Sequence, residues 1–219
     1  DWTARLARKY DRRFFVRLVK GAYWDTEIKL SHVGGFTDFP VFTRKLATDV
    51  SYLACAEKML AADDAIYPAF ATHNAYTIGA IKALAGSKPL EFQRLHGMGE
   101  DIYGALAQME GNARTNVRIY APTGTHKDLL AYLVRRLLEN GANSSFVNRM
   151  ADAEVPAAEL ATDPVAELAT LEPYRNPAIP LPADIFPDRR NSAGVDLSDP
   201  LVLEPLQERL AALESRHWT

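Results

Sequence analysis

Short apolar segments alternate with helix-like segments four times over the first 141 residues, and this order restricts the fold more than any other feature. The strand-like segments are 13–20, 65–72, 90–95 and 116–121, and the helix-like segments are 2–11, 46–61, 75–85, 101–110 and 125–140. Such alternation is typical of a parallel sheet with helical crossovers. Since no GxGxxG follows the first strand, a dinucleotide-binding open sheet is disfavoured. The sequence therefore predicts an α/β fold of another kind.

Polar side chains gather where each predicted strand ends. Arg17 and Lys20 stand on the first strand, residues 72–74 follow the second, residues 93–96 close the third, and Tyr120 closes the fourth. In a (β/α)8 barrel the active site forms at the carboxyl ends of the strands, so this distribution favours a barrel over an open sheet.

A barrel of this type closes with eight strands, and four are predicted here. The opening residues 2–11 read as the middle of a helix, and no methionine starts the chain. We therefore expect the second half of a (β/α)8 barrel in a piece of a longer protein, with the other half upstream.

The first strand and the residues after it read Val-Arg-Leu-Val-Lys-Gly-Ala-Tyr-Trp-Asp over residues 16–25. Alternation along a strand puts Arg17 and Lys20 on opposite faces. Gly21 would allow close approach of a flat or anionic ligand, and Tyr23 and Trp24 could pack on a ring. An edge strand with solvated basic side chains remains the alternative interpretation.

The helix over 125–140 carries two different faces. Its apolar stripe consists of Leu129, Leu130, Leu133, Val134, Leu137 and Leu138, and the opposite face consists of Tyr132, Arg135, Arg136 and Glu139. Paired guanidinium groups suit a carboxylate clamp, because each can bind a carboxylate through two parallel hydrogen bonds. The spacing alone favours an ordinary solvated face with an i, i+4 ion pair.

Composition excludes several classes of protein. A net charge of −3 argues against a nucleic-acid partner for this region. One cysteine, Cys55, fits a reducing compartment, and we expect it on the buried face of its helix. No apolar run approaches the roughly 20 residues of a membrane span. Histidines at 73, 96 and 126 lack metal-ligand spacing, so no metal site is predicted.

Residues 151–219 differ in character from the rest, since nine of the 13 prolines fall there. Proline fixes φ and removes a donor, so we expect an extended linker, followed by a helix over 199–215. The predicted organisation is a barrel half over 1–150 and a linker over 151–219.

Five motifs in this order resemble the proline dehydrogenase family, and most closely the proline dehydrogenase domain of bifunctional proline utilization A enzymes. They are RLVKGAYWD at 17–25, FATHN at 70–74, EFQ at 91–93 with LHGMGE at 95–100, RIYAP at 118–122, and LLAYLVRRLLENGAN at 129–143. The resemblance implies an FAD-dependent (β/α)8 barrel that oxidises L-proline to Δ1-pyrroline-5-carboxylate and passes electrons to membrane quinone.

The resemblance also implies roles for individual residues. The proline pocket would be formed by Tyr23, Leu95, Tyr120, Arg135 and Arg136, with the two arginines on the carboxylate. The FAD-binding residues would be Arg17, Lys20, Gly21, Ala22, Trp24, Thr72, His73, Asn74, Gln93 and Glu139, the last also supporting the arginine pair. The linker would lead toward an aldehyde dehydrogenase domain, and the enzyme would be cytoplasmic or peripheral at the inner membrane.

Two other interpretations remain open. The chain alone could be a non-catalytic core piece or partner surface, since half of the expected barrel is absent from it. Alternatively, it could belong to another (β/α)8 enzyme of a carboxylate substrate, such as an aldolase that uses Lys20 to form a Schiff base.

Overall fold

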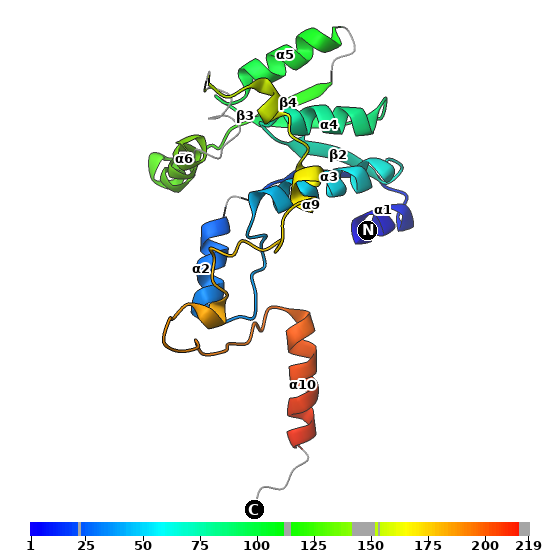
Figure 1. Cartoon of the computed structure of the whole chain (residues 1–219). Helices are drawn as coiled ribbons and strands as arrows, with labels where there is room; N and C mark the ends of the chain where they lie inside the picture. The colour runs from blue at the N-terminus through cyan, green and yellow to red at the C-terminus, as the bar shows by residue number, and fades with distance from the viewer. Residues whose placement is uncertain (22, 112–114, 142–151, 153, 215–219) are drawn as a thin grey trace, which may run out of the picture. The chain divides into compact units, whose positions relative to one another are not determined.

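The computed structural model describes residues 1–21, 23–111, 115–141, 152 and 154–214 (Figure 1). It divides into two compact units. The first comprises 1–22 and 46–171, and the second comprises 23–45 and 172–219.

The first unit is built on a four-stranded parallel sheet with the order β1-β2-β3-β4. The strands are β1 (Phe14–Val19), β2 (Ile66–Ala71), β3 (Glu91–Leu95) and β4 (Asn116–Tyr120). Each lies inside its predicted segment, so the prediction of a parallel α/β sheet is confirmed.

One face of this sheet packs against helices. These are α1 (Trp2–Lys9), α3 (Lys45–Ala61), α4 (Ala75–Ala85) and α5 (Glu100–Glu110). Phe70 and Phe92 point into this layer and are fully buried, with ring centroids 6.2 Å apart. Tyr52 of α3, Ile81 of α4 and Tyr103 of α5 complete the same apolar cluster. Burial of this face is the main stabilising contribution within the unit.

Helix α3 buries one stripe, formed by Tyr52, Ala56 and Leu60 at successive i+4 positions. Cys55 lies a 100° rotation away from Ala56 and is exposed. The prediction of a buried Cys55 was therefore wrong, because apolar neighbours in sequence did not identify which face of α3 packs.

The opposite face of the sheet is aromatic and polar, and it is concave. The Arg17 guanidinium of β1 lies 4.9 Å from the centroid of the Tyr120 ring of β4, and Arg118 of β4 lies 5.8 Å from the Phe15 ring of β1. Three strand spacings of about 4.8 Å would separate these strands by about 14 Å in a flat sheet. Side chains of the outermost strands therefore meet because the sheet curves toward this face, as in an arc of a barrel.

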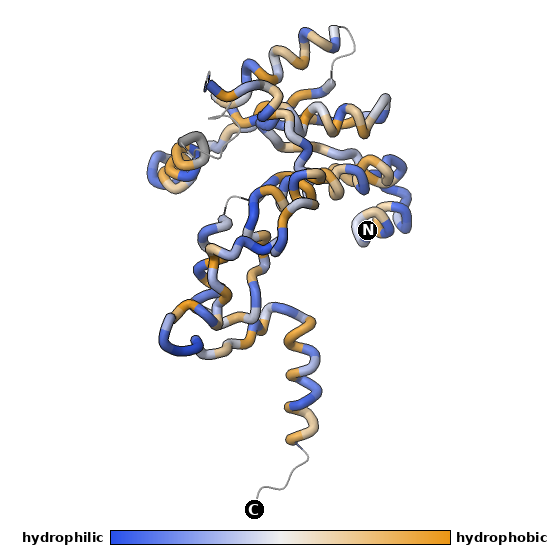
Figure 2. Tube along the Cα trace, in the orientation of Figure 1, coloured by the Kyte–Doolittle hydropathy of each residue, from blue (hydrophilic) through white to orange (hydrophobic). Residues whose placement is uncertain are grey.

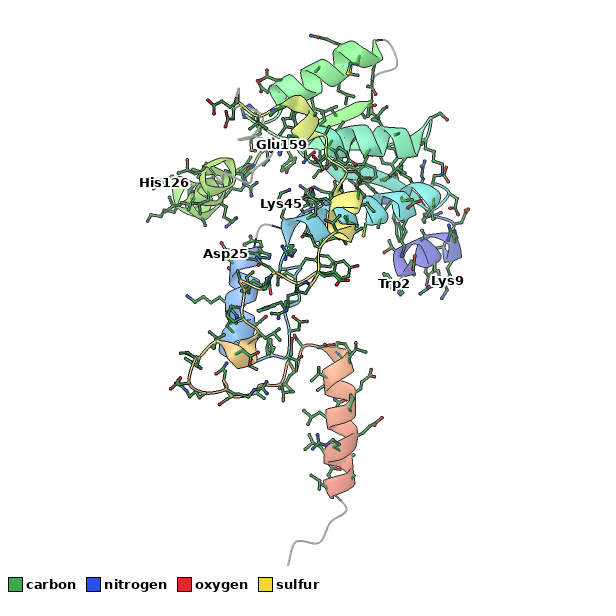
Figure 3. The ribbon with its side chains drawn as sticks, viewed as in Figure 1. Trp2, Lys9, Asp25, Lys45, His126 and Glu159 are labelled. Atoms are coloured by element: carbon green, nitrogen blue, oxygen red, sulfur yellow. The ribbon has the colours of Figure 1, made fainter. Side chains whose placement is uncertain are left out.

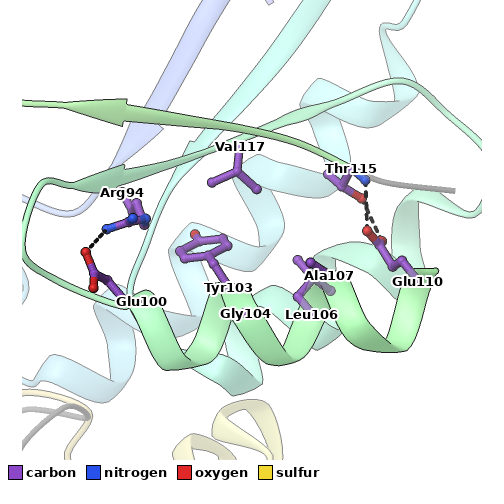
Figure 4. A pocket seen from close by; sticks show the side chains of 9 residues that line it. All are labelled: Arg94, Glu100, Tyr103, Gly104, Leu106, Ala107, Glu110, Thr115 and Val117. Atoms are coloured by element: carbon purple, nitrogen blue, oxygen red, sulfur yellow. Dashed lines mark hydrogen bonds and ion pairs between the residues drawn. The ribbon is translucent and has the colours of Figure 1, made fainter. Parts of the chain in front are cut away.

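A cavity of about 370 Å³ lies on the helix side of the sheet, between α5 and strands β3 and β4 (Figure 4). Figure 4 shows Val117 above the Tyr103 ring, with the Arg94–Glu100 pair at one end and Thr115–Glu110 at the other. Its lining lies on the face opposite to Arg17, so this cavity does not belong to the predicted site.

Helix α6 (His126–Gly141) follows β4 and confirms the helix predicted over 125–140, with Gly141 as its last residue. At its start, labelled by His126 in Figure 3, the backbone N–H and hydroxyl of Thr125 donate to Asp128 Oδ2 at 3.3 and 2.8 Å. Figure 2 shows apolar and polar residues interleaved along α6. The apolar stripe is exposed within the described part of the chain, at Leu130, Leu133, Val134, Leu137 and Leu138.

The proline-rich segment is not extended throughout, contrary to the prediction. It forms α8 (Ala157–Leu160) and α9 (Pro164–Ala169) in the first unit, and the 3₁₀ turn η1 (Pro182–Asp184) in the second. Proline stands at the first turn of α9 and of η1, where its missing N–H costs nothing. The expected terminal helix is present as α10 (Pro200–Glu214).

The second unit also contains α2 (Trp24–Gly34), a helix that the sequence analysis did not predict. Its residues bury only Ile28 and Ser31, so the chain lacks the regular apolar spacing that would identify it. The helix ends at Gly35, which adopts a left-handed conformation with φ of 61°.

Part of the proline-rich segment binds back onto α2. Asn191 Nδ2 donates to the carbonyl of His32 at 3.1 Å, and the backbone N–H of Gly194 donates to the carbonyl of Gly35 at 2.9 Å. The His32 ring contacts the carbonyl of Pro180 at 2.9 Å. Residues 180–194 therefore form a strap that fixes the end of α2.

We expect Gly194→Ala to loosen this strap, because the new Cβ would overlap the carbonyl oxygen of Gly34. Overpacking against backbone typically costs about 1–3 kcal/mol. Hydrogen exchange of the α2 amides should accelerate by roughly 5- to 150-fold. Gly79→Ala in α4 is the matched control, since a Cβ there meets nothing within 4 Å and α2 protection should not change. Unaltered α2 exchange in Gly194→Ala would contradict the strap.

Candidate functional site

Arg17 lies on the concave face of the sheet, in β1. Its side chain is exposed and its guanidinium lies over the Tyr120 ring, a favourable cation–π arrangement. Leu18, the next residue, packs against the apolar cluster on the other face. The structure therefore brings the predicted residues Arg17 and Tyr120 together from the two outermost strands.

Lys20 lies just beyond the end of β1 and turns toward α3 rather than toward Arg17. Its ammonium group pairs with Asp49 and lies 5.2 Å from the centroid of the Tyr52 ring. The Tyr52 hydroxyl in turn donates to the carbonyls of Leu18 and Ala71 at 3.2 and 3.3 Å. Asp49 was missed by the sequence analysis, although it stands one helical turn before Tyr52 on the same helix.

Residues 72–74 form the turn from β2 into α4. Asn74 caps the helix, since its side-chain oxygen accepts from the backbone N–H of Thr77 at 3.0 Å. Thr72 Oγ1 accepts from the backbone N–H of Asn74 at 3.2 Å, and the Thr72 carbonyl accepts from the Tyr103 hydroxyl at 2.8 Å. These bonds fix the turn at the carboxyl edge of the sheet.

His73 is held in one tautomer by β3. The backbone N–H of Leu95 donates to His73 Nε2 at 3.1 Å, so the proton of the neutral ring stands on Nδ1. Burial, together with the positive charges of Arg136 and Arg94, lowers the pKa of His73 to about 4. The ring is therefore neutral at pH 7 and presents one N–H donor. A Cβ on Gly99 would crowd this ring, which explains the glycine there.

We expect the titration of His73 to lower the free energy of unfolding as the pH falls. Its pKa is about 4 when folded and about 6.5 when unfolded, so the unfolded chain binds more protons between these values. The free energy of unfolding should therefore decrease as pH falls from about 6.5 to about 4. Thermal unfolding across this range measures the slope. In His73→Gln, the side-chain oxygen can still accept from the Leu95 N–H, and the free energy of unfolding should depend less on pH. An identical pH slope in this variant and the wild type would contradict the lowered pKa of His73.

Gln93 lies on the concave face of β3 beside two charged residues. Its Nε2 donates to Glu91 Oε1 at 2.8 Å. Arg118 of β4 binds Glu91 through both carboxylate oxygens, each at 2.8 Å. The guanidinium lowers the pKa of Glu91, so its carboxylate is charged at neutral pH. Glu91 and Arg118 were not predicted as site residues, although Glu91 precedes Gln93 by two positions on the same face.

The arginine pair of α6 is partly buried, whereas the leucine stripe of that helix is exposed. The Arg136 guanidinium lies 5.4 Å from the centroid of the Tyr132 ring, and its charge acts on His73. This arrangement differs from a solvated arginine face. Glu139 lies in α6, but its side chain is outside the described part of the structure.

The remaining predicted residues fall in several places. Leu95 ends β3 and is buried. A Cβ on Gly21 would meet nothing within 4 Å, so the space beside it is open. Ala22 lies outside the described residues. Tyr23 and Trp24 begin α2 in the second unit, where the Trp24 indole N–H donates to the carbonyl of Phe42 at 2.7 Å.

The described residues contain no group of three or more histidine, cysteine, aspartate or glutamate side chains arranged to hold a metal ion. In the same residues, no helix combines the length and the apolar character that a membrane crossing requires.

A family model described as proline dehydrogenase matches residues 1–149. The bifunctional protein PutA of Salmonella typhimurium is 50% identical over 231 residues, which cover 100% of this chain and 18% of that protein. The bifunctional protein PutA of Escherichia coli is 51% identical over 228 residues. The chain thus spans about a fifth of the length of these curated relatives.

Solved structures give the same result. A mutant of Bradyrhizobium japonicum proline utilization A (PutA) matches with a TM-score of 0.89 and 52% identity, over 96% of this chain and 22% of that one. These matches confirm the resemblance on which the sequence analysis relied, and they confirm the barrel-type α/β fold.

Proposed function

The chain belongs to the proline dehydrogenase family, and from this we propose that it supplies the carboxyl-terminal barrel half of an enzyme that oxidises L-proline to Δ1-pyrroline-5-carboxylate. The observation that carries the proposal is the family match over 1–149, on a sheet whose concave face presents Arg17 and Tyr120. Proline catabolism is then the process served by the complete protein.

We propose FAD as the cofactor. The donor groups at the carboxyl edge of the sheet suit a large anionic molecule with a flat ring system: Arg17 is cationic and exposed, and His73 presents a single N–H. The open space beside Gly21 leaves room for such a group. Arg17, Lys20, Gly21, Ala22, Trp24, Thr72, His73, Asn74, Gln93 and Glu139 would hold it. When bound, FAD supplies the two-electron acceptor that the protein itself lacks.

Arg135 and Arg136 would bind the substrate carboxylate. Their partial burial favours this role, because a guanidinium–carboxylate pair gains strength where water is partly excluded. Tyr23, Leu95 and Tyr120 would shape the pocket for the proline ring, with Tyr120 already placed under the Arg17 guanidinium. Bound in this way, proline would be fixed by its charged end, leaving its ring for oxidation.

We further propose that the barrel half ends near residue 150 and that 151–219 leads toward an aldehyde dehydrogenase domain. The relatives' name, bifunctional protein, and their roughly fivefold greater length support this arrangement. The missing barrel half would come from an upstream segment. Membrane quinone would be the electron acceptor, and the complete enzyme would then be cytoplasmic with a peripheral association at the inner membrane.

The two alternatives are less well supported. A Schiff-base lysine needs a free amine to attack the substrate carbonyl, whereas the Lys20 ammonium group is paired with Asp49. A purely structural core piece gives no reason for charged and polar groups on the concave face of the sheet.

Steady-state assays of the complete protein test the proposal. With L-proline and a soluble quinone, we expect acceptor reduction together with a product that reacts as a cyclic imine. Borohydride treatment with substrate should leave Lys20 unmodified. Covalent trapping on Lys20 without acceptor reduction would instead favour the aldolase alternative.

A further inference from the structure

Glu91, Gln93 and Arg118 form a polar group on the concave face of the sheet, and the role of Glu91 and Arg118 is not explained by the proposed function. Gln93 is buried, and the Glu91 side chain is only 7% exposed. Arg118 binds Glu91 through two parallel hydrogen bonds and also lies over the Phe15 ring. The carboxylate is therefore fixed by a two-point contact from the neighbouring strand.

The Glu91 carboxylate, paired with the Arg118 guanidinium, can only accept hydrogen bonds. The group of Gln93 that faces Glu91 Oε1 must therefore be its NH2, and the carbonyl oxygen must face elsewhere. Among the described residues, no donor bonds to Gln93 Oε1. The Gln93 amide is thus fixed in one of its two orientations, and its carbonyl oxygen Oε1 is available to accept a further hydrogen bond.

Stability alone does not account for this group. An ion pair with one exposed partner, here Arg118, contributes little net stability. The same face carries the stacked pair Phe15–Tyr67 next to it. The register places Gln93 directly beside Ala71, the last residue of β2 before the Thr72–Asn74 turn. The fixed amide therefore lies next to the edge at which FAD is proposed to bind.

We propose that Glu91, held by Arg118, is a positioning residue that orients the Gln93 amide so that its carbonyl oxygen accepts from an N–H or O–H group of the bound cofactor. FAD offers such donors at its flavin imide, ribityl hydroxyls and adenine amino group. The inference rests on the proposed function, since it assumes a cofactor at this edge.

The substitution Glu91→Gln tests the orientation directly. Glu91 Oε1 accepts from both Gln93 and Arg118 Nε, and Oε2 accepts from Arg118 Nη2, so the side chain of Glu91→Gln has one oxygen for three donors. Its NH2 must then face a donor of Arg118 or of Gln93, and the side chain at position 91 no longer fixes the Gln93 amide. The carbonyl oxygen of Gln93 is then not held toward the cofactor, so FAD affinity should fall by about tenfold.

The measurement is FAD titration of the complete protein after cofactor removal, for Glu91→Gln, Gln93→Leu and the double variant. We expect both single variants to weaken FAD binding and the double variant to bind no more weakly than Gln93→Leu, because Glu91 acts only through Gln93. Additive losses in the double variant, or wild-type affinity in Glu91→Gln, would overturn the proposal.

Glu110→Gln is the matched control. Glu110 is also a paired carboxylate, and it is partly buried: it accepts from Thr115 at 2.7 and 2.8 Å and pairs with Lys82, but it lies at the helix-side cavity (Figure 4). Loss of the Glu110 carboxylate should lower the unfolding temperature without changing FAD affinity. If Glu110→Gln weakens FAD binding as much as Glu91→Gln, the effect is general destabilisation and the proposal fails.

Arg118→Lys provides a second test if Glu91→Gln does not fold. Lysine keeps the charge but not the two-point contact, so Glu91 should be less firmly held and FAD affinity should fall by a smaller factor, about threefold. Wild-type affinity in this variant would also overturn the proposal. Absence of any FAD binding by the wild-type protein is a different outcome, because it would refute the proposed function itself.

Discussion

Replacing either Arg135 or Arg136 by Met in the complete protein is expected to raise the KM for L-proline by tenfold or more. Both arginines are partly buried on α6, and Arg136 is close enough to His73 for its charge to lower the pKa of that ring. A charge-assisted bidentate contact to a carboxylate is worth about 1.5–3 kcal/mol. At about 1.4 kcal/mol per tenfold change in affinity, its loss accounts for the expected rise.

Arg135→Lys or Arg136→Lys should recover little of the lost affinity for L-proline, since lysine carries a point charge without the planar fork of arginine. Flavin content should change much less than KM, because most proposed cofactor contacts come from the strand ends. Leu137→Met, on the exposed stripe of the same helix, is the control and should leave KM unchanged. If both arginine variants kept a near-normal KM, α6 would present an ordinary solvated ion-pair face and the carboxylate would need another anchor.

The isolated chain of 219 residues is expected to bind FAD at least tenfold more weakly than the complete protein. Its concave face is open within the described residues: Phe15 is 51% exposed and Val19 is 47% exposed. A cofactor bound there would contact one wall only and would remain largely hydrated on the other side. The four strands would also have to order their exposed side chains on binding, which reduces affinity.

Fluorescence titration of both proteins with FAD measures the difference. Circular dichroism of the isolated chain should accompany it, so that weak binding can be separated from failure to fold. Equal FAD affinity of the isolated chain and the complete protein would contradict the expectation, and it would mean that these four strands hold all the important contacts.

The four strands and most helices could be predicted from the sequence because their apolar residues repeat regularly and Gly or polar turns separate them. Helix α2 could not, since only Ile28 and Ser31 are buried along its length. The back-binding of residues 180–194 to α2 also escaped prediction, because it depends on backbone contacts such as Gly194 to Gly35 that leave no periodic pattern.

The site was predictable only in part. Strand alternation predicted only that Arg17 and Lys20 point to opposite faces; the structure places the Arg17 guanidinium on the concave face, over the Tyr120 ring. The sequence did not reveal that Lys20 turns toward Asp49, because that contact joins a strand end to a helix 29 positions later. It also missed Arg118, whose role depends on the register that places β4 beside Glu91 and Gln93.

The proposed chemistry is tested most directly by mixing the complete protein with L-proline in the absence of oxygen while the flavin absorbance is recorded. We expect a yellow protein whose absorbance is bleached by L-proline, with far slower bleaching by pyrrolidine, which lacks the carboxylate that Arg135 and Arg136 would bind. A colourless protein, or a yellow protein that L-proline leaves unchanged, would contradict the proposed chemistry.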